Sequence, residues 1–358
     1  MFPTAVVWIL ALVVSWQLTQ AIRQYALNRA IIDVPNERSS HSQPTPRGGG
    51  LALVVVTIGG AWVFYLLLLR DSAWFPLLMY TIGAVLIAGV SWLDDLRSLS
   101  NRLRLATHVL GALIAVVGLG FWHTIRLPFF GPVPFDLIGL LITIIWIVGL
   151  TNAYNFMDGI DGIAGSQAVV AGLGWAVLGW RTDDALVGLL GLLLTASSLG
   201  FLGHNWPPAR IFMGDVGSAF LGYSFAVLPL IAMSTTINMA VWDRLPLTAA
   251  LLVWPFVFDT VLTFLRRLRA GENVFAPHRS HLYQRLIITG HSHRFVTLLY
   301  IGLAVVGFVL AFVWWLALPG ADLIVGMTIP LLCVGLWAFV GEEQRRHLLH
   351  NRPERTPS

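Results

Sequence analysis

Residues 137–162 read LIGLLITIIWIVGLTNAYNFMDGIDG, a long apolar run that passes directly into a cluster of amides and carboxylates. A helix of about 20 apolar residues is long enough to span the hydrocarbon core of a bilayer. The apolar part of this stretch therefore predicts a membrane span, and its polar part then falls at the membrane boundary. Ionisable groups at such depth generally have a function, so this stretch predicts a membrane protein with its chemistry at one face of the bilayer.

The same apolar pattern recurs along the chain. Apolar runs between polar breaks are continuous rather than alternating, which favours helices and argues against a β-barrel. Eleven candidate spans result, at residues 3–22, 50–69, 76–93, 105–121, 137–152, 165–180, 185–201, 217–233, 246–265, 295–316 and 323–340. We predict an all-α transmembrane bundle of 10–11 spans, with one membrane-embedded domain over residues 1–341 and a tail over residues 342–358.

Composition supports a membrane protein. Of 358 residues, 57% are hydrophobic and only 11% are charged, whereas soluble domains carry about 25% charged residues. Residues 1–23 lack a basic start and a convincing cleavage site, so they are expected to remain as an anchor rather than a signal peptide. The single cysteine, Cys333, excludes an intramolecular disulfide.

Arginine sets the expected orientation. All 22 basic residues are arginine, and 18 of them lie on one set of connections if the N-terminus is outside. The positive-inside rule then predicts an N-terminus outside and a cytoplasmic C-terminus. The basic excess is thereby explained without a nucleic-acid partner.

Asp94 and Asp95 end the third expected span. Adjacent carboxylates repel each other and are costly to desolvate, so such a pair usually manages a metal ion, another cation or a proton. The alternative is a solvated helix end that is neutralised by Arg97.

The segment Asn152–Gly162 contains Asn152, Asn155, Asp158 and Asp161. If the fifth span continues as a helix, the first three of these side chains return to one face. An acidic turn or a calcium loop is the alternative, although the ligand spacing of an EF-hand is absent.

Residues 212–218 read FMGDVGS, with glycine on either side of Asp215–Val216. Such a carboxylate suits Mg²⁺, which uses few protein carboxylates and keeps substrate oxygens and waters around it. The alternative is a glycine-rich turn in which Asp215 caps the next helix.

The loop 266–294 holds six arginines, with His278, Arg279 and His281 near its centre. Arginine forks suit phosphate oxygens. A basic loop that only sets orientation, or a zinc site at the two histidines, are alternatives. Asp259, inside the preceding span, is expected to pair with Arg266 or Arg267.

Five motifs follow in a fixed order: RSSH with PTPRGGG at 38–50, the Asp94–Asp95 pair, NxxNxxDGxDG, FMGDxGS and HRSH at 278–281. Together they resemble the polyprenyl-phosphate N-acetylhexosamine-1-phosphate transferase family, glycosyltransferase family 4, over residues 33–294. The resemblance implies transfer of a sugar-1-phosphate from a UDP-sugar to undecaprenyl phosphate, with release of UMP. It also implies a bacterial inner-membrane location with the site at the cytoplasmic face, so that the N-terminus is periplasmic.

The resemblance also implies roles for individual residues. Mg²⁺, with Mn²⁺ as a substitute, is expected on Asn155 and Asp215. Asp161 and Phe212 are expected to contact uracil, and Asp94 or Asp95 the lipid phosphate. The remaining expected site residues are Asp158 and His281 in catalysis, and Arg47, His278 and Arg279 in donor binding.

The donor sugar is less determined. Many relatives have a histidine-x-histidine pair where this chain has His281-Leu282-Tyr283. This variant resembles the subgroup that initiates O-antigen or other envelope polysaccharides with N-acetylfucosamine or N-acetylquinovosamine, and UDP-GlcNAc is the alternative donor. Arg47, where peptidoglycan-type relatives tend to have lysine, argues against a MurNAc-pentapeptide substrate. A homodimer is left open.

Two other classes of protein are weighed. A transporter would place its charges near midspan, often on broken helices, but Asp259 is the one acid expected there. A membrane scaffold would bind partners without turnover. Both fit the lopsided distribution of polar motifs less well than an enzyme.

Overall fold

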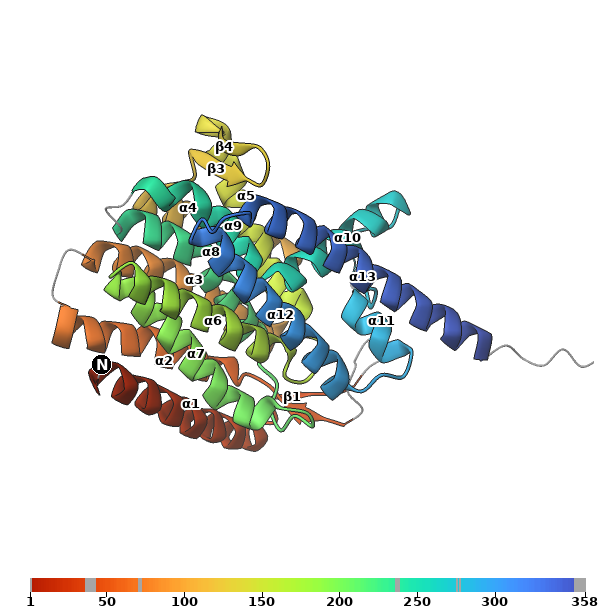
Figure 1. Cartoon of the computed structure of the whole chain (residues 1–358). Helices are drawn as coiled ribbons and strands as arrows, with labels where there is room; N and C mark the ends of the chain where they lie inside the picture. Colours follow the sequence, from red (N-terminus) through yellow and green to blue (C-terminus); the bar gives the residue numbers. More distant parts are fainter. Residues whose placement is uncertain are drawn as a thin grey trace, which may run out of the picture.

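The computed structural model describes residues 2–35, 43–69, 73–235, 239–274, 276 and 278–350. Over these residues the chain is a bundle of helices with two short strand pairs (Figure 1). The helices are α1 (Phe2–Asn28), α2 (Gly50–Phe64), α3 (Trp74–Arg97), α4 (Asn101–Leu119), α5 (Asp136–Met157), α6 (Ile163–Arg181), α7 (Ala185–Asn205), α8 (Asp215–Thr235), α9 (Leu245–Leu252), α10 (Trp254–Arg269), α11 (Leu282–Ile288), α12 (His293–Trp315) and α13 (Ala321–His350). A π-helical turn (Tyr65–Leu69) extends α2. A 3₁₀ helix (Met239–Arg244) precedes α9.

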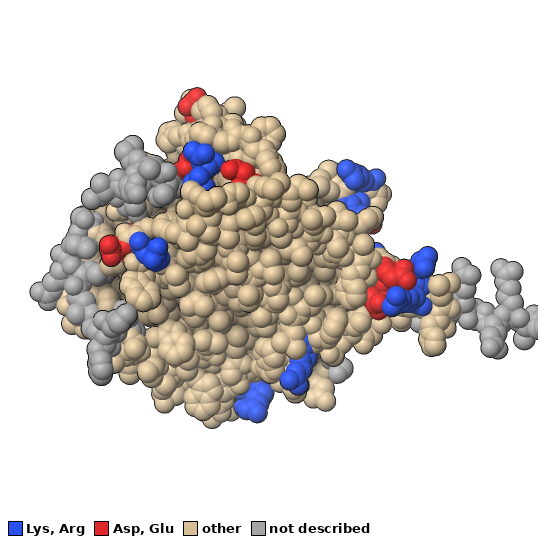
Figure 2. Space-filling view, viewed as in Figure 1, with Lys and Arg blue, Asp and Glu red and all other residues tan. Residues whose placement is uncertain are grey.

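Ten helices of the described chain are long and apolar enough to cross a membrane, and a bent pair makes eleven if it is one span. The predicted all-α bundle and its span count are confirmed. Figure 2 shows one side of the molecule, with a broad central area free of charged side chains. The Arg, Asp and Glu side chains in this view lie near its outline. This distribution suits lipid around the middle of the bundle and water or headgroups at its ends. The chain is therefore a multi-pass membrane protein.

The ninth predicted span, residues 246–265, is wrong as one continuous helix. It is two helices, α9 and α10, that meet at an angle of 76°. Pro255 lies in the first turn of α10, where its missing N–H is tolerated, but it cannot donate to the carbonyl four residues earlier and so cannot continue α9. As a result, α10 projects away from the bundle (Figure 1).

Helix α8 is the centre of the bundle. Of its spanning window, 94% is buried, against 17% for α1 and α13. It packs against each of α2 to α7. Its mid-helix contacts include a hydrogen bond of 2.9 Å between Ser224 and Tyr80 of α3. The first residue of this central helix is Asp215, so the best-packed element of the fold places a predicted metal ligand.

The two strand pairs lie on different connections. Ile32–Asp33 (β1) pairs antiparallel with Thr45–Pro46 (β2) next to the start of α2. Thr124–Leu127 (β3) pairs with Gly131–Pro134 (β4) in a hairpin between α4 and α5, which the sequence analysis did not predict. Arg126 of this hairpin forms an ion pair of 2.9 Å with Asp243.

Glycine lets the start of α2 cross the start of α8 at backbone contact. A Cβ on Gly217 would lie 2.6 Å from Cα of Gly50, far inside any normal contact. The approach brings the Gly49 and Gly50 N–H groups to the carbonyls of Phe212 and Met213, at 3.0 and 2.9 Å. The PTPRGGG and FMGDVGS motifs are thus joined through their backbones.

Gly217→Val should therefore destabilise the protein, by about 1–3 kcal/mol or more, because the new side chain overpacks this crossing. Gly149→Val is the matched control, since a Cβ on Gly149 meets nothing within 4 Å. Thermal unfolding in detergent measures both variants. Equal midpoints for the two would contradict the role given to the crossing.

Candidate active site

Carboxylates from three separate helix ends meet at one end of the bundle. Asp94 and Asp95 lie in the last turn of α3, Asp158 directly follows α5, and Asp215 begins α8. The backbone N–H of Asp215 donates to Asp95 at 3.1 Å. Burial and then the charges of Asp215, Asp95 and Asp161 raise the pKa of Asp158 well above its usual range. The motifs that the sequence analysis singled out are thus neighbours in space.

Asp95 caps the central helix from outside. Its two carboxylate oxygens accept the backbone N–H groups of Asp215 and Val216, both at 3.1 Å. The first N–H groups of a helix have no partner within the helix, and a negative charge there also matches the helix dipole. Since Asp95 is only 3% exposed, its first task in the ligand-free protein is to hold α8.

Asp94 faces another partner. Its Oδ2 lies 3.0 Å from Nη1 of Arg104, and the same nitrogen lies 3.2 Å from Oδ2 of Asp215. One guanidinium of α4 therefore bridges the two carboxylates. A cation at this point offsets the repulsion between them. The predicted partner of the acidic pair, Arg97, is not the residue that makes this bridge.

Arg104 was missed as a site residue, since the sequence analysis counted it only among the orientation-setting arginines. Its position in the sequence could have suggested a role. Arg104 lies in the first turn of the mainly apolar helix α4, which follows the Asp94–Asp95 pair after a short connection. Only the fold brings it to Asp215, which lies 111 positions further along the chain.

Asn152, Asn155 and Asp158 were predicted to share one helix face, and the structure does not bring all three together. Asn152 points to α4, where its Nδ2 lies 3.0 Å from Nδ1 of His108. Asn155 instead donates to Ser218 of α8 at 3.3 Å. Helix α5 ends at Met157, so Asp158 leaves the helical register. Asn155 and Asp215 thus flank the first turn of α8, whereas Asn152 lies elsewhere.

The residues present fit a hard divalent ion of the Mg²⁺ type. No group of three or more His, Cys, Asp or Glu side chains within the described ranges could hold a metal ion by itself. Mg²⁺ does not need such a cage, since it commonly takes one or two carboxylates and completes its shell with waters and substrate phosphates. The local excess of buried and half-buried carboxylates over cations also favours a bound cation.

The connection before α2 closes one side of the site. The guanidinium of Arg47 donates to the backbone carbonyl of Asp95, and its Nη1 lies 4.0 Å from the Asp95 carboxylate. Residues 38–41, the RSSH motif, lie outside the described residues. Arg47 is thus brought to the acidic cluster, whereas its expected role in donor binding stays a prediction.

Asp161 lies on the connection between α5 and α6, and Phe212 lies on the connection between α7 and α8. Asp161 accepts the N–H of Ala209 at 3.0 Å and lies 3.3 Å from Nδ1 of His293. The Phe212 backbone is held by the carbonyl of Pro46, at 2.8 Å. The contacts of Asp161 order this connection, and the expected uracil contacts stay predictions.

The last loop approaches the site from α10 and α11. The rings of His278 and His281 stack at 5.0 Å, and the ring of Phe156 lies 6.2 Å from that of His281. Burial is the main cause that lowers the pKa of His278 to about 4, so its imidazole is neutral near pH 7. Arg279 directly follows His278 in this loop, and its expected role in donor binding stays a prediction.

The prediction that Asp259 pairs with Arg266 or Arg267 is wrong. Arg267 instead forms an ion pair of 2.7 Å with Glu272, and Arg266 donates to the carbonyl of Ser280. Asp259 turns to His281, at 3.2 Å. The reason is geometric: Asp259 lies on the buried side of α10 with the last loop packed over it, whereas the arginines follow at the end of the helix.

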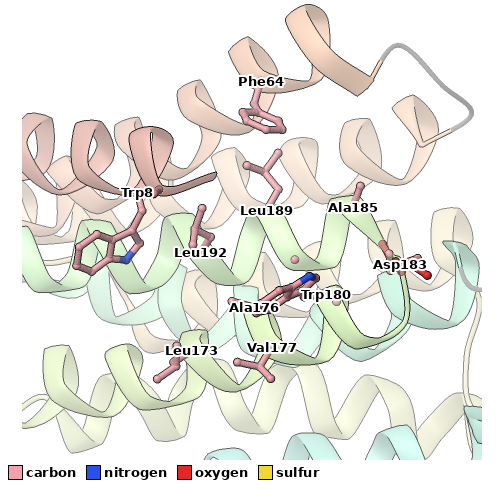
Figure 3. A pocket seen from close by; sticks show the side chains of 14 residues that line it. Trp8, Phe64, Leu173, Ala176, Val177, Trp180, Asp183, Ala185, Leu189 and Leu192 are labelled. Carbon is pink, nitrogen blue, oxygen red and sulfur yellow. The ribbon is translucent and has the colours of Figure 1, made fainter. Parts of the chain in front are cut away.

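A cavity of about 640 Å³ lies away from the acidic cluster (Figure 3). Rings of Trp8, Phe64 and Trp180 line it, together with Asp183 at one edge. On α6 its lining begins at Leu173 and runs to the far end of the helix, whereas the acidic cluster adjoins the start of α6. This cavity is therefore no part of the candidate site.

The two carboxylates of the Asp94–Asp95 pair should respond differently to neutralisation. Asp95→Asn removes an acceptor for an α8 N–H and should cost about 0.5–2 kcal/mol of stability, as loss of a helix cap does. Asp94→Asn should cost less, because its partly exposed bridge to Arg104 is worth about 0–1 kcal/mol. Thermal unfolding of both purified variants measures the two losses of stability. An equal or larger loss for Asp94→Asn would refute the assignment of Asp95 as the cap of α8.

Comparison with known proteins identifies the family of this chain. A family model described as Glycosyl transferase family 4 matches residues 77–233, which include the acidic pair, the Asn155–Asp161 segment and Asp215. A probable undecaprenyl-phosphate N-acetylglucosaminyl 1-phosphate transferase of Bacillus subtilis is 32% identical over 82% of this chain and 80% of its own length. A decaprenyl-phosphate N-acetylglucosaminephosphotransferase of Mycobacterium tuberculosis is 31% identical over 85% and 81%.

A more distant relative covers less of the chain. A phospho-N-acetylmuramoyl-pentapeptide-transferase of Latilactobacillus sakei is 32% identical over 52% of this chain and 61% of its own length. The resemblance drawn from the five motifs is confirmed by these matches. The chain belongs to glycosyl transferase family 4, among the polyprenyl-phosphate N-acetylhexosamine-1-phosphate transferases.

Proposed function

We propose that this protein transfers a sugar-1-phosphate from a UDP-N-acetyl-hexosamine or deoxyhexosamine to undecaprenyl phosphate, giving undecaprenyl-diphospho-sugar and UMP. The observation that carries the proposal is the convergence of Asp94, Asp158 and Asp215 with Arg104 at one end of a membrane bundle. The names of the relatives support the same reaction class.

Asp215 and Asn155 would hold Mg²⁺. When bound, this ion supplies positive charge to the diphosphate of the donor, which is the main requirement of phosphoryl transfer. Asp215 is well suited, because the packing of α8 fixes its backbone and Asp95 caps the same turn. The ion pair between Arg104 and Asp215 would then break. The guanidinium of Arg104 could turn to phosphate oxygens, which suit its planar fork.

The acceptor phosphate is the nucleophile. One of its oxygens forms a bond to the sugar-side phosphorus, while the bond from that phosphorus to the UMP oxygen breaks and UMP leaves with the electron pair. A phosphate monoester is largely ionised near pH 7, since its second pKa is about 6, so a strong general base is not required. Of the acidic pair, we assign the contact with the acceptor to Asp94. Both oxygens of Asp95 hold the backbone of α8, whereas Oδ2 of Asp94 is paired with Arg104, the guanidinium that turns to phosphate in the proposed arrangement.

Two donor classes compete. The His281-Leu282-Tyr283 sequence favours N-acetylfucosamine or N-acetylquinovosamine and initiation of O-antigen or another envelope polysaccharide. The names of the relatives favour GlcNAc. The Tyr283 hydroxyl donates to the backbone carbonyl of Phe156 at 2.9 Å and the residue is fully buried. It therefore does not reach the donor in this state, which weakens the first choice.

We also place the site on the cytoplasmic side of the inner membrane. The arginine count supports a periplasmic N-terminus and puts the acidic pair, Asp215 and the last loop on the same basic side. UDP-sugars are charged and do not cross a bilayer unaided, so the site must face the compartment that supplies them.

The reaction and its sidedness can be tested together by following UMP release in sealed vesicles with undecaprenyl phosphate. Inside-out vesicles should release UMP in the presence of Mg²⁺ and release none in EDTA. Right-side-out vesicles should release no UMP until they are permeabilised. UDP-N-acetylfucosamine, UDP-N-acetylquinovosamine and UDP-GlcNAc are compared, and the fastest identifies the donor.

Asp215→Asn should lower this UMP release by at least about 100-fold, as loss of a main charge-stabilising group does. The variant should keep the wild-type unfolding midpoint to within a few degrees, since the capping contacts of Asp95 use the Asp215 backbone. Full activity of Asp215→Asn in Mg²⁺ would refute the metal assignment. Absence of UMP release by folded wild-type protein with every donor would refute the reaction.

Removing the charge of Arg104 should tighten metal binding while it lowers turnover, because its guanidinium competes with a divalent ion for Asp215. We expect Arg104→Gln to bind Mn²⁺ about threefold or more tightly in the absence of substrates, as read by electron paramagnetic resonance of free Mn²⁺. Arg102→Gln is the control, since Arg102 is exposed on the same helix. Weaker Mn²⁺ binding by Arg104→Gln than by the control would contradict this arrangement.

A further inference from the structure

Asp259 is a buried carboxylate that the proposed reaction does not yet use. It lies in α10 and is 0% exposed. Within the described chain, five donors reach it: Nδ1 of His281 and Oγ1 of Thr263 at 3.2 Å, the N–H groups of Leu282 and Tyr283 at 2.8 and 3.2 Å, and the hydroxyl of Tyr300 at 2.6 Å. A carboxylate without such partners would be very costly to bury.

Three of these donors belong to the start of α11. Asp259 accepts the N–H groups of its first two residues, Leu282 and Tyr283, and the ring of the preceding residue, His281. Asp259 thus fixes the short helix and the histidine in a single arrangement. Three helices meet at this carboxylate, since Thr263 shares α10 with it, Leu282 and Tyr283 begin α11, and Tyr300 comes from α12.

The contact also determines which nitrogen of His281 carries a proton. An ionised carboxylate can only accept, so Nδ1 must donate. Nε2 is then the ring nitrogen that remains to meet a ligand, in the way that a carboxylate orients the histidine of a catalytic triad or a metal site. The His281 side chain is 4% exposed. Its ring lies near those of His278 and of Phe156, which stands two residues before Asp158 in the chain.

Tyr283 connects the same unit to α5. Its hydroxyl donates to the carbonyl of Phe156 at 2.9 Å. A Cβ on Gly159 would lie 2.1 Å from this hydroxyl, so glycine is needed for the approach. The start of α11 is therefore held at one side by Asp259 and at the other by the segment that carries Asn155 and Asp158.

We propose that Asp259 is a positioning residue for the transfer reaction, which holds His281 in its Nδ1–H form and aims Nε2 at the donor diphosphate. The inference rests on the proposed function and adds a residue that acts on the substrate only through His281. A buried acid that merely stabilised the fold would affect folding but leave the turnover of the folded molecules unchanged.

The test combines Asp259→Asn with His281→Asn in a double-mutant cycle on UMP release. Asn at 281 keeps an amide near the place of Nδ1 but has no group at the place of Nε2. We expect each single variant to lower kcat at least tenfold with KM changed less than about threefold, which is the pattern for an interaction made in the transition state. The double variant should match His281→Asn to within about threefold, because Asp259 then has nothing left to orient.

Thr263→Val is the control, since it removes a donor from the same carboxylate without touching His281. Its kcat should stay within about twofold of wild type. Should Asp259→Asn fail to fold, His281→Gln replaces it, because Gln cannot donate from the Nδ1 position; a kcat for that variant within threefold of wild type would overturn the inference.

Three results overturn the inference or its basis. A folded Asp259→Asn protein with kcat within threefold of wild type overturns it, and so do single effects that multiply in the double variant. Wild-type protein that releases no UMP with any donor overturns the proposed function, and the inference falls with it. The first two results leave the transferase reaction standing, so the two failures are distinguishable.

Discussion

The capping of α8 by Asp95 is the contact on which the site depends. Two carboxylate oxygens from the end of α3 accept the first N–H groups of the most buried helix in the bundle. This contact joins two motifs that are 120 residues apart in sequence. It also fixes the direction in which α8 begins, and therefore the place of Asp215. The glycines of α2 can cross α8 closely only because its start is held in this position.

A concentration of buried acids needs a reason, because each one costs free energy to desolvate. Asp95 is compensated by helix N–H groups, and Asp94 shares one guanidinium with Asp215. Asp158 has less compensation, and its raised pKa reflects burial beside three other acids. Such a deficit of positive charge is unfavourable without a ligand and would be relieved by the cation of the proposed reaction. The same group of acids would then both cost stability and attract the metal ion.

The sequence predicted the parts of this structure that depend on local pattern. Uninterrupted apolar runs locate the spans, since lipid admits few alternatives to a helix. The polar motifs at span ends locate the site, because they share one side of the membrane. Contacts between distant residues were beyond reach: Arg104 is ordinary in sequence, and only packing against α8 gives it a partner in Asp215. Asp259 is similar, since its neighbours in sequence suggested arginine and its neighbours in space include histidine. The break at Val253 was missed because the run stays apolar on both sides of Pro255.

That break has a consequence for how substrates of very different kinds could reach one site. Because α10 turns away by 76°, it leaves the ring of helices and carries exposed apolar side chains such as Phe264 and Leu268 outward. These side chains suit contact with the acyl chains of the bilayer beside the end of α5. In the proposed reaction, the polyprenyl tail of the acceptor would stay in the bilayer next to α10, while its phosphate is presented at the end of the bundle. The water-soluble nucleotide donor would arrive from the aqueous side. Two reactants that share no solvent can then meet without either one leaving its own phase.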